Sequence, residues 1–535
     1  MLLFLILLSV MILYVFPETE TPNMAYAARF NGISWPLGQA FPHFCCITTA
    51  LDQIDITNLD NEQKLLFVTL EGLVNRTQPR IYIKDAVRED YRLWPQQMHL
   101  TLNPILDPYS MITKYQSQIA GLIVYDPTVP DTMNLATTIA GLKDALVASP
   151  EEAIRLQAIP YHQHILVDLR KNKFPSASAV YQYAYRTYWA QTGHRLIAGL
   201  SVKTFGTFRD YAIATRSMIV WLDPRDQMQK AILDAFFKDM GAGSAYMGWW
   251  ADERSGVREA SLYGIGTFAS DLSSNLTVMG ATQQAIIHRS SQPQQLTLEN
   301  KTYIAIFLSD GDNIQINQHL IATKWADPDR GKVPIGWTLS PALVDLAPAV
   351  LNYYKSTATS NDELISGPSG MGYAYPNLMS AAALSVYTAQ TRTYLQLAGF
   401  DIITVWGTTP YMPITVGEAY QNPSTYPLRG ITTQQIAATD RSGSRFYGHE
   451  LPSLSLNEAY ANSKEELELA IESAASNTTA QSGPHFIAIQ GNINSSSINP
   501  STLYSLQQLF KTNSNIVFVG PEELFMLLRA YYLSH

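Results

Sequence analysis

Strands and helices alternate regularly along the last part of the chain, from residue 300 to the C-terminus. Apolar, β-favouring runs are separated by helical segments with clear boundaries, and Pro341, for example, follows Ser340 at the first position of a helix. About seven β/α repeats fit a closed or nearly closed barrel better than an open sheet. The expected strands are 303–308, 334–339, 363–365, 400–405, 446–447, 486–490 and 516–519. The sequence therefore predicts an α/β protein with a C-terminal barrel.

Smaller α/β units are expected before the barrel, because shorter strands and helices alternate there and favour small parallel sheets. No G-x-G-x-x-G motif follows the first strand of the second unit, so nothing indicates a dinucleotide site and no cofactor is expected. The expected boundaries are 1–27 for a signal peptide, 28–100, 101–174 and 175–295 for three small α/β units, and 296–535 for the barrel.

The N-terminal segment predicts export. Residues 1–16 are nearly all apolar but fall short of the roughly 20 residues that a membrane-spanning helix needs. Ala25-Tyr26-Ala27 fits a signal-peptidase site, so we expect cleavage after Ala27 and a secreted or extracytoplasmic protein that is free of the membrane. Because no Lys or Arg precedes the apolar run, an uncleaved anchor is the alternative.

Charge and cysteine content narrow the possible partners. The net charge is −9, only 15% of residues are charged and no long basic run occurs, which argues against nucleic acid or an anionic membrane surface. A neutral ligand such as a glycan remains compatible with this charge.

The adjacent Cys45 and Cys46 are expected to be buried thiols, because a disulfide bridge between neighbouring residues is strained. No Cys/His spacing indicates zinc, and the oligomeric state stays open.

The first barrel strand runs into a cluster of polar residues. The segment 303–313, YIAIFLSDGDN, is an apolar run that ends in Asp310, Asp312 and Asn313. In a β/α barrel the ligand binds at the carboxyl ends of the strands, so these side chains predict acid/base catalysis, cation binding or contact with sugar hydroxyls. The alternative is that Asp-Gly-Asp-Asn is only turn chemistry.

The other strand ends contribute further acids, amides and aromatic residues. The candidates from these ends are Trp337, Trp406, Glu450, Gln490 and Asn492. Almost no cation is found among them, which suits an uncharged polyhydroxylated ligand better than a phosphate.

Aromatic residues lie beside acids at two further places. In the third small unit, Trp249 precedes Glu253 and resembles the lining of a sugar subsite; the alternative is a core tryptophan with solvated acids. In the loop after the third barrel strand, Tyr373 and Tyr375 are two residues apart and face the same way if the segment is extended. They form either a sugar-stacking wall or a plug in the barrel mouth.

The same loop carries a family resemblance. Residues 370–376, GMGYAYP, match every fixed position of the motif that names the GxGYxYP family of putative glycoside hydrolases. Further stretches resemble the family in the same order, at 71–76, 79–82, 248–249, 309–313 and 336–341, so the similarity covers about residues 43–530. The resemblance implies a C-terminal β/α barrel of the glycoside hydrolase/deacetylase type, preceded by smaller α/β units.

Glycoside hydrolysis needs two carboxyl groups on either side of the scissile bond. Asp310 and Asp312 lie in one tight turn, so one of them, preferably Asp312, is expected to pair with an acid from elsewhere. The candidate partners are Glu253, Asp362 and Glu450.

Two other functions fit the same residues. In a metal-dependent carbohydrate deacetylase, the two aspartates would hold a divalent cation that activates water. The absence of any H-x-x-x-H pair argues against that reading, and no metal is expected. A secreted glycan-binding protein without catalysis is the second alternative, since fold does not imply function.

Overall fold

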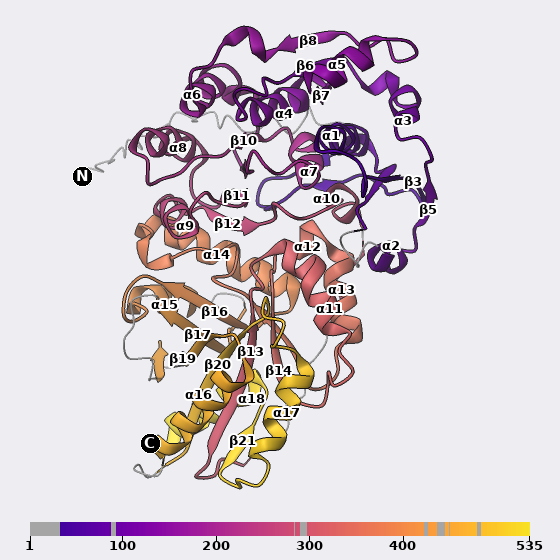
Figure 1. Cartoon of the computed structure of the whole chain (residues 1–535). Helices are drawn as coiled ribbons and strands as arrows, with labels where there is room; N and C mark the ends of the chain where they lie inside the picture. Colours follow the sequence, from indigo (N-terminus) through magenta and orange to yellow (C-terminus); the bar gives the residue numbers. More distant parts are fainter. Residues whose placement is uncertain are drawn as a thin grey trace, which may run out of the picture.

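The structure is a computed structural model that describes residues 33–86, 92–282, 284–288, 297–421, 426–435, 444–448, 450–478 and 483–534. Small N-terminal sheets and their helices form one half of the molecule, and the C-terminal barrel forms the other (Figure 1). The expected signal peptide lies outside the described residues. Within the described ranges, no helix has the length and apolar character that crossing a membrane requires.

A closed ring of parallel strands forms the C-terminal half, which confirms the predicted α/β barrel. Among the described residues, each strand pairs with the next in chain order, and the last pairs back with the first. The ring consists of β13 (Thr302–Ser309), β14 (Ile335–Leu339), β15 (Asp362–Ser366), β16 (Ile402–Gly407), β17 (Gly430–Gln435), β19 (Leu451–Ala461) and β20 (His485–Asn492). The larger helices that accompany it are α13 (Pro348–Thr357), α14 (Ala381–Ala398), α15 (Ile414–Gln421), α16 (Lys464–Thr478), α17 (Pro500–Phe510) and α18 (Pro521–Ser534).

Two of the predicted ring strands are wrong. Residues 446–447 belong to β18 (Ser444–Tyr447), which pairs antiparallel with β19 outside the ring, and β21 (Ile516–Phe518) pairs only with β13. Their places are taken by β17 and β19, whose sequences GITTQQ and LPSLSLNEAYA lack a continuous apolar run. Neighbouring strands impose the extended conformation there, and this overrides a weak local preference.

Alternate residues of the strands face the inside of the barrel. Phe307, Ile365, Ile402, Leu454 and Ala488 come from different strands and share one buried cluster with side chains of α18. Because side chains alternate along a strand, every second residue from these positions also faces inward. The start of α18 lies against the first parts of β14 and β17, where it packs near the amino ends of the strands.

The N-terminal half contains small sheets whose strands all pair in parallel. The first sheet consists of β3 (Ala50–Asp55), β4 (Ile81–Lys84) and β5 (Thr101–Pro104). The second consists of β6 (Leu122–Val124), β7 (Leu146–Ala148) and β8 (Ile165–Asp168). The third consists of β9 (Leu196–Gly199), β10 (Met218–Val220), β11 (Ala245–Gly248) and β12 (Gly266–Ala269). Because β5 pairs with β3, the first sheet extends past residue 100, where the first unit was expected to end.

The end of helix α1 (Asn61–Thr77) ties the small domains together. The Arg76 guanidinium donates to the backbone oxygens of Gly141 (2.7 Å) and Ile213 (2.6 Å), which lie in the second and third units. Asn75 donates to the Ile81 oxygen and to Thr277 Oγ1. Residues 71–76 therefore have a structural role. Cys45 and Cys46 are free thiols, as predicted, but the predicted burial is wrong, because Cys45 is half-buried and Cys46 exposed.

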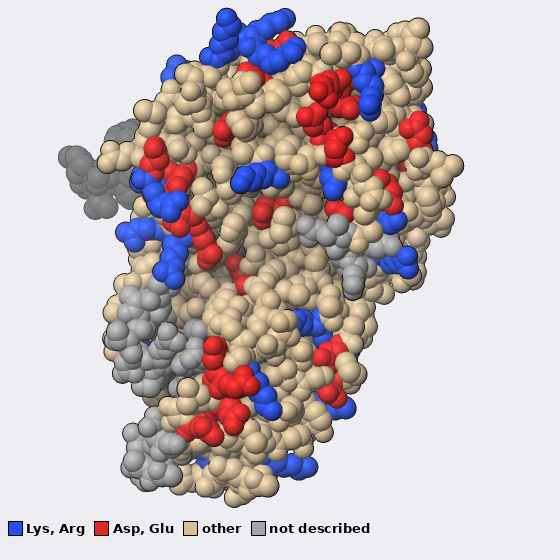
Figure 2. Space-filling view, in the orientation of Figure 1, with Lys and Arg blue, Asp and Glu red and all other residues tan. Residues whose placement is uncertain are grey.

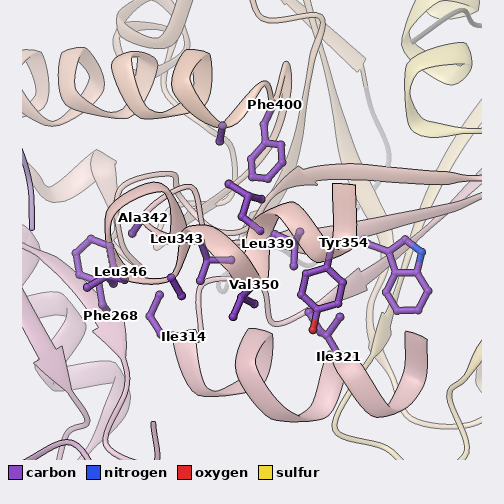
Figure 3. Close-up of a cluster of buried hydrophobic side chains, with 14 of the residues drawn as sticks. Phe268, Ile314, Ile321, Leu339, Ala342, Leu343, Leu346, Val350, Tyr354 and Phe400 are labelled. Carbon is purple, nitrogen blue, oxygen red and sulfur yellow. The ribbon is translucent and has the colours of Figure 1, made fainter. Parts of the chain in front are cut away.

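The third unit packs directly on the barrel half. Figure 3 shows Phe268 of β12 beside Leu346 of α12 (Leu343–Leu346), within one cluster of buried apolar side chains. Thr267 and Tyr373 exchange two backbone hydrogen bonds, of 3.0 and 2.7 Å. The loop with the GMGYAYP sequence is thereby joined to the edge of the third sheet.

We predict that Phe268→Ala weakens this junction. Phe268 is 2% exposed, and removing a buried phenyl ring costs about 3–5 kcal/mol. Differential scanning calorimetry should show a lower melting temperature and a broader transition than in the parent protein. The matched control is Leu509→Ala, at a side chain that is 49% exposed, and it should leave the transition in place. Equal transitions for Phe268→Ala and the parent would contradict the prediction.

Candidate active site

The turn after β13 holds two carboxyl groups at the end of the barrel strands. Gly311 N–H donates to Thr338 Oγ1 (2.9 Å), and that hydroxyl donates to the Leu308 oxygen (2.5 Å). A Cβ at Gly311 would clash with the Thr338 backbone, so the turn needs glycine to lie this close to β14. Asp310 is 8% exposed and Asp312 5% exposed. The turn therefore places both carboxyl groups in buried positions.

A third carboxylate comes from another domain. Glu253 lies in the first turn of α9 (Glu253–Leu262), after β11 of the third unit, and is solvent-exposed. Tyr373 Oη donates to Glu253 Oε1 at 3.3 Å. The charge of Glu253 raises the pKa of both Asp310 and Asp312, so the three groups lie within electrostatic reach of one another. The expected pairing of Asp312 with Glu253 stays a prediction, and the electrostatic effect of Glu253 on Asp312 agrees with it.

Burial is the main reason why these carboxyl groups hold protons tightly. Burial and then the Glu253 charge raise the pKa of Asp310 to about 7, although hydrogen bonds from Asn494 and Ser309 oppose the shift. Burial and then the Asp310 charge raise the pKa of Asp312 well above its usual value. Desolvation also raises the pKa of Glu253, because neighbouring protein atoms restrict water around this exposed residue. Protons are therefore retained in the cluster near neutral pH.

Aromatic rings form a continuous wall beside the carboxyl groups. The Tyr373 ring lies 5.5 Å from Tyr375 and 5.0 Å from Trp406, and Trp406 lies 6.0 Å from Tyr460. The hydroxyl groups of Tyr373 and Tyr375 are hydrogen-bonded at 2.8 Å. Tyr460 was not among the predicted site residues, because it lies on β19, which was not predicted as a strand. With that strand known, Tyr460 is an aromatic residue near its carboxyl end.

Amide side chains surround the aspartates. Asn313 Nδ2 donates to Asp312 Oδ1 (3.2 Å), and Asn494 Nδ2 donates to Asp310 Oδ2 (2.7 Å). Asn492 donates to Asn462 Oδ1 and accepts from the Asn494 backbone, so it positions the loop that carries Asn494. Asn494 follows β20, so it lies at the strand end where the sequence predicts amide side chains.

The structure does not bring Asp362 or Trp337 to the carboxyl cluster, which corrects the prediction for both. Asp362 is the first residue of β15, at the amino end of the barrel strands, and forms an ion pair with Arg330 (2.5 Å). It also accepts from Trp337 Nε1 (2.9 Å). Trp337 is fully buried and packs against Trp325 at 4.9 Å. Both residues are structural.

Glu450 is also misplaced by the sequence prediction. It directly precedes β19, at the amino end of that strand, and faces Arg529 of α18 at 3.8 Å with a largely exposed side chain. The predicted strand 446–447 put Glu450 at a carboxyl end, and that strand lies outside the ring. Trp249 is half-buried against the N-terminal core, while its neighbour Trp250 stacks on Tyr246 at 3.6 Å.

The cluster offers few ligands for a metal ion. Within the residues that the structure describes, no group of three or more His, Cys, Asp or Glu side chains is arranged to hold a metal ion. The site consists of carboxyl groups, amides and aromatic rings, which together suit proton transfer beside a ligand rich in hydroxyl groups.

Family models match almost the whole chain in four consecutive segments. They are the GxGYxYP first domain at residues 50–118, the second domain at 119–192, the third domain at 194–281, and the "GxGYxYP putative glycoside hydrolase C-terminal domain" at 300–529. The chain belongs to the GxGYxYP family. Family membership agrees with the resemblance in the GMGYAYP loop, and it associates the chain with carbohydrate substrates without fixing a substrate or mechanism.

A solved structure shares the complete fold. The putative hydrolase from Bacteroides thetaiotaomicron VPI-5482 superposes with a TM-score of 0.82 at 22% identity, over 93% of this chain and 99% of that one. A putative polysaccharide deacetylase from Mycobacterium smegmatis covers 46% of this chain and 96% of its own, with a TM-score of 0.31 and 10% identity. No curated protein matches.

We predict that Asp310→Asn stabilises the folded protein above neutral pH. The pKa of Asp310 is about 7 in the folded state and near 3.8 when unfolded, so the folded state binds the extra proton between these values. Stability therefore falls as pH rises from about 4 to about 7, and asparagine removes this loss. The melting temperature of the variant should exceed that of the parent by on the order of a few degrees at pH 8, and by less at pH 4.5.

The control is Glu450→Gln, which removes an exposed carboxylate far from the cluster and should give the same small change at both pH values. A decrease in melting temperature for Asp310→Asn that is equal at pH 4.5 and pH 8 would contradict the assigned cause.

Proposed function

We propose that this protein is a secreted glycoside hydrolase that cleaves an uncharged poly- or oligosaccharide by carboxylate acid/base catalysis. The observation that carries the proposal is the meeting of Glu253 with the buried Asp310–Asp312 pair at the carboxyl ends of the barrel strands. Two carboxyl groups in unlike environments are what glycosidic bond cleavage requires.

The environments suggest a role for each group. Asp312 is the proposed general acid, because burial and the neighbouring Asp310 favour its protonated form. Glu253 is the proposed second carboxylate, since it is exposed and therefore accessible to water. As Asp310 ionises near pH 7, its charge raises the pKa of Asp312 further, and the Asn494 side chain positions Asp310 through a hydrogen bond.

The surroundings favour a neutral ligand. The wall of Tyr373, Trp406 and Tyr460 lies beside the carboxyl groups, and aromatic side chains are the residues that stack on apolar sugar faces. Figure 2 shows a molecular face where uncharged surface predominates, in line with a charged fraction of 15%. An anionic substrate would instead call for Arg or Lys beside the carboxyl groups.

We predict that Asp312→Asn and Glu253→Gln abolish hydrolysis. General acid or base catalysis contributes about 10²–10⁴-fold, so kcat should fall by at least about 10²-fold in each variant. Release of reducing sugars from a broad panel of neutral polysaccharides is the measurement. The matched control is Glu450→Gln, which alters an acid at the opposite end of the strands and should retain parental kcat.

Activity that survives in Asp312→Asn would contradict the assigned role of Asp312. Glycan binding by both proteins, without cleavage by either, would instead identify a binding protein that lacks catalysis.

We also predict a pH optimum below neutrality. The proton-donating form of the cluster is lost as pH rises through its raised pKa values, so kcat/KM should decline above about pH 7. In Asp310→Asn the like charge that raises the pKa of Asp312 is gone, and the declining limb should move to lower pH. A pH–rate profile of both proteins tests this. An unchanged declining limb in the variant would show that Asp310 does not affect the titration that limits the rate.

A further inference from the structure

The inner surface of the barrel is apolar in its interior and becomes polar near the carboxyl ends of the strands. Ser309 shares the inward alternation of Phe307, and Gln490 pairs directly with Phe307 across the β13–β20 ladder. Trp406 shares the alternation of Ile402 and pairs with Gln434 across β16–β17. These residues occupy inward-facing positions at or near the carboxyl ends of their strands. The barrel therefore presents polar groups at the end where the carboxyl cluster lies.

Several of these polar atoms are buried and lack a partner. Gln490 is 0% exposed, yet neither its Nε2 nor its Oε1 has a hydrogen-bond partner among the described residues. The same holds for Trp406 Nε1, in a side chain that is 8% exposed, and for Gln434 Oε1. A buried unsatisfied group costs about 1–3 kcal/mol, and native proteins keep such groups few. Four such atoms on three inward-facing positions of one barrel, two of which pair directly across β16–β17, point to a ligand.

The unpartnered atoms adjoin the proposed catalytic groups. Ser309 immediately precedes Asp310, and Ser309 pairs with Asn492 two residues beyond Gln490. The Trp406 ring contacts Tyr373, whose hydroxyl donates to Glu253. A ligand that reaches Gln490 and Trp406 would therefore lie beside all three carboxyl groups.

The same region is enclosed. Asp310 and Asp312 are at most 8% exposed, and Tyr373 and Tyr375 at most 2%. On the deeper side, Thr404 and Thr432 satisfy each other at 2.8 Å above the apolar cluster of the barrel interior. Glu253 is the exposed member of the cluster, and the buried aspartates and tyrosines leave little surface along which a polysaccharide could lie, so we infer that a chain end enters from the side of Glu253.

We propose that Gln490, Gln434 and Trp406 form a subsite that binds the hydroxyl groups of one neutral sugar residue at a chain end. The inference rests on the proposed glycoside hydrolase function. A glutamine amide offers both donors and an acceptor, and the indole N–H adds a donor, which together match adjacent sugar hydroxyls. Hydrolysis at this subsite releases single sugar residues from the chain end.

The test is Gln490→Leu, with calorimetric titration of methyl glycosides of the neutral hexoses, pentoses and 6-deoxyhexoses. We expect at least one glycoside to bind the parent protein and to bind the variant at least about tenfold more weakly. The melting temperature should stay equal or rise, because leucine removes two unpartnered buried polar atoms. The matched control is Gln508→Leu, an exposed glutamine on α17, which should bind as the parent does.

Two results would overturn the subsite. One is that no glycoside binds the parent. The other is that Gln490→Leu lowers the melting temperature and leaves affinity unchanged, which would make Gln490 a structural residue bridged by water.

The earliest products of cleavage separate this inference from the hydrolase proposal. Single sugars from the first time point support the subsite. A mixture of oligosaccharides overturns it while leaving hydrolysis intact. Glycoside binding that Gln490→Leu abolishes, without cleavage by the parent, supports the subsite and refutes the hydrolase.

Discussion

The junction between Thr267 and Tyr373 determines whether the carboxyl cluster exists. Glu253 belongs to the third domain and the two aspartates to the barrel, so no single domain contains the set. Two backbone hydrogen bonds fix the GMGYAYP loop to β12, and from there Tyr373 reaches Glu253. The small N-terminal domains thus do more than precede the barrel, because they supply part of its candidate active site.

The residues of the GMGYAYP loop follow from this junction. Gly370 and Gly372 have φ values of +112° and +89°, which side chains disfavour, and a Cβ at Gly372 would crowd the backbone of Gly266 at 2.9 Å. Tyr375 N–H donates to Ser261 Oγ (2.9 Å) on α9, the helix that begins with Glu253. The glycines permit the loop to approach β12 closely, and the Tyr373 hydroxyl group then reaches the Glu253 carboxylate. One short sequence therefore holds two domains in register and lines the site.

How much the sequence could predict depends on whether a feature is local. The β13 strand and its Asp-Gly-Asp-Asn turn were predictable, because an apolar run and a turn signal stand side by side. The roles of Asp362 and Glu450 were not, since they depend on which end of a strand each residue occupies. β17 and β19 form only because neighbours on both sides pair with them. Glu253 was visible as an acid after a strand, but its approach to Asp310 depends on domain packing through side chains such as Phe268.

Two threonines in the barrel interior show that buried polar groups with a purely structural role are hydrogen-bonded to each other. Thr404 and Thr432 lie two residues before Trp406 and Gln434 on the same strands and face the same way, and their hydroxyl groups are fully buried. They bond to each other, so each of the two hydroxyl groups has a hydrogen-bond partner at that depth. Two residues further along, the equivalent positions carry polar atoms that do not bond to each other. A fold that pairs Thr404 with Thr432 could also provide hydrogen-bond partners for Gln434 and Gln490. Leaving them unpaired beneath a cluster of carboxyl groups is costly for folding, and a ligand that supplies the missing bonds offsets that cost when it binds.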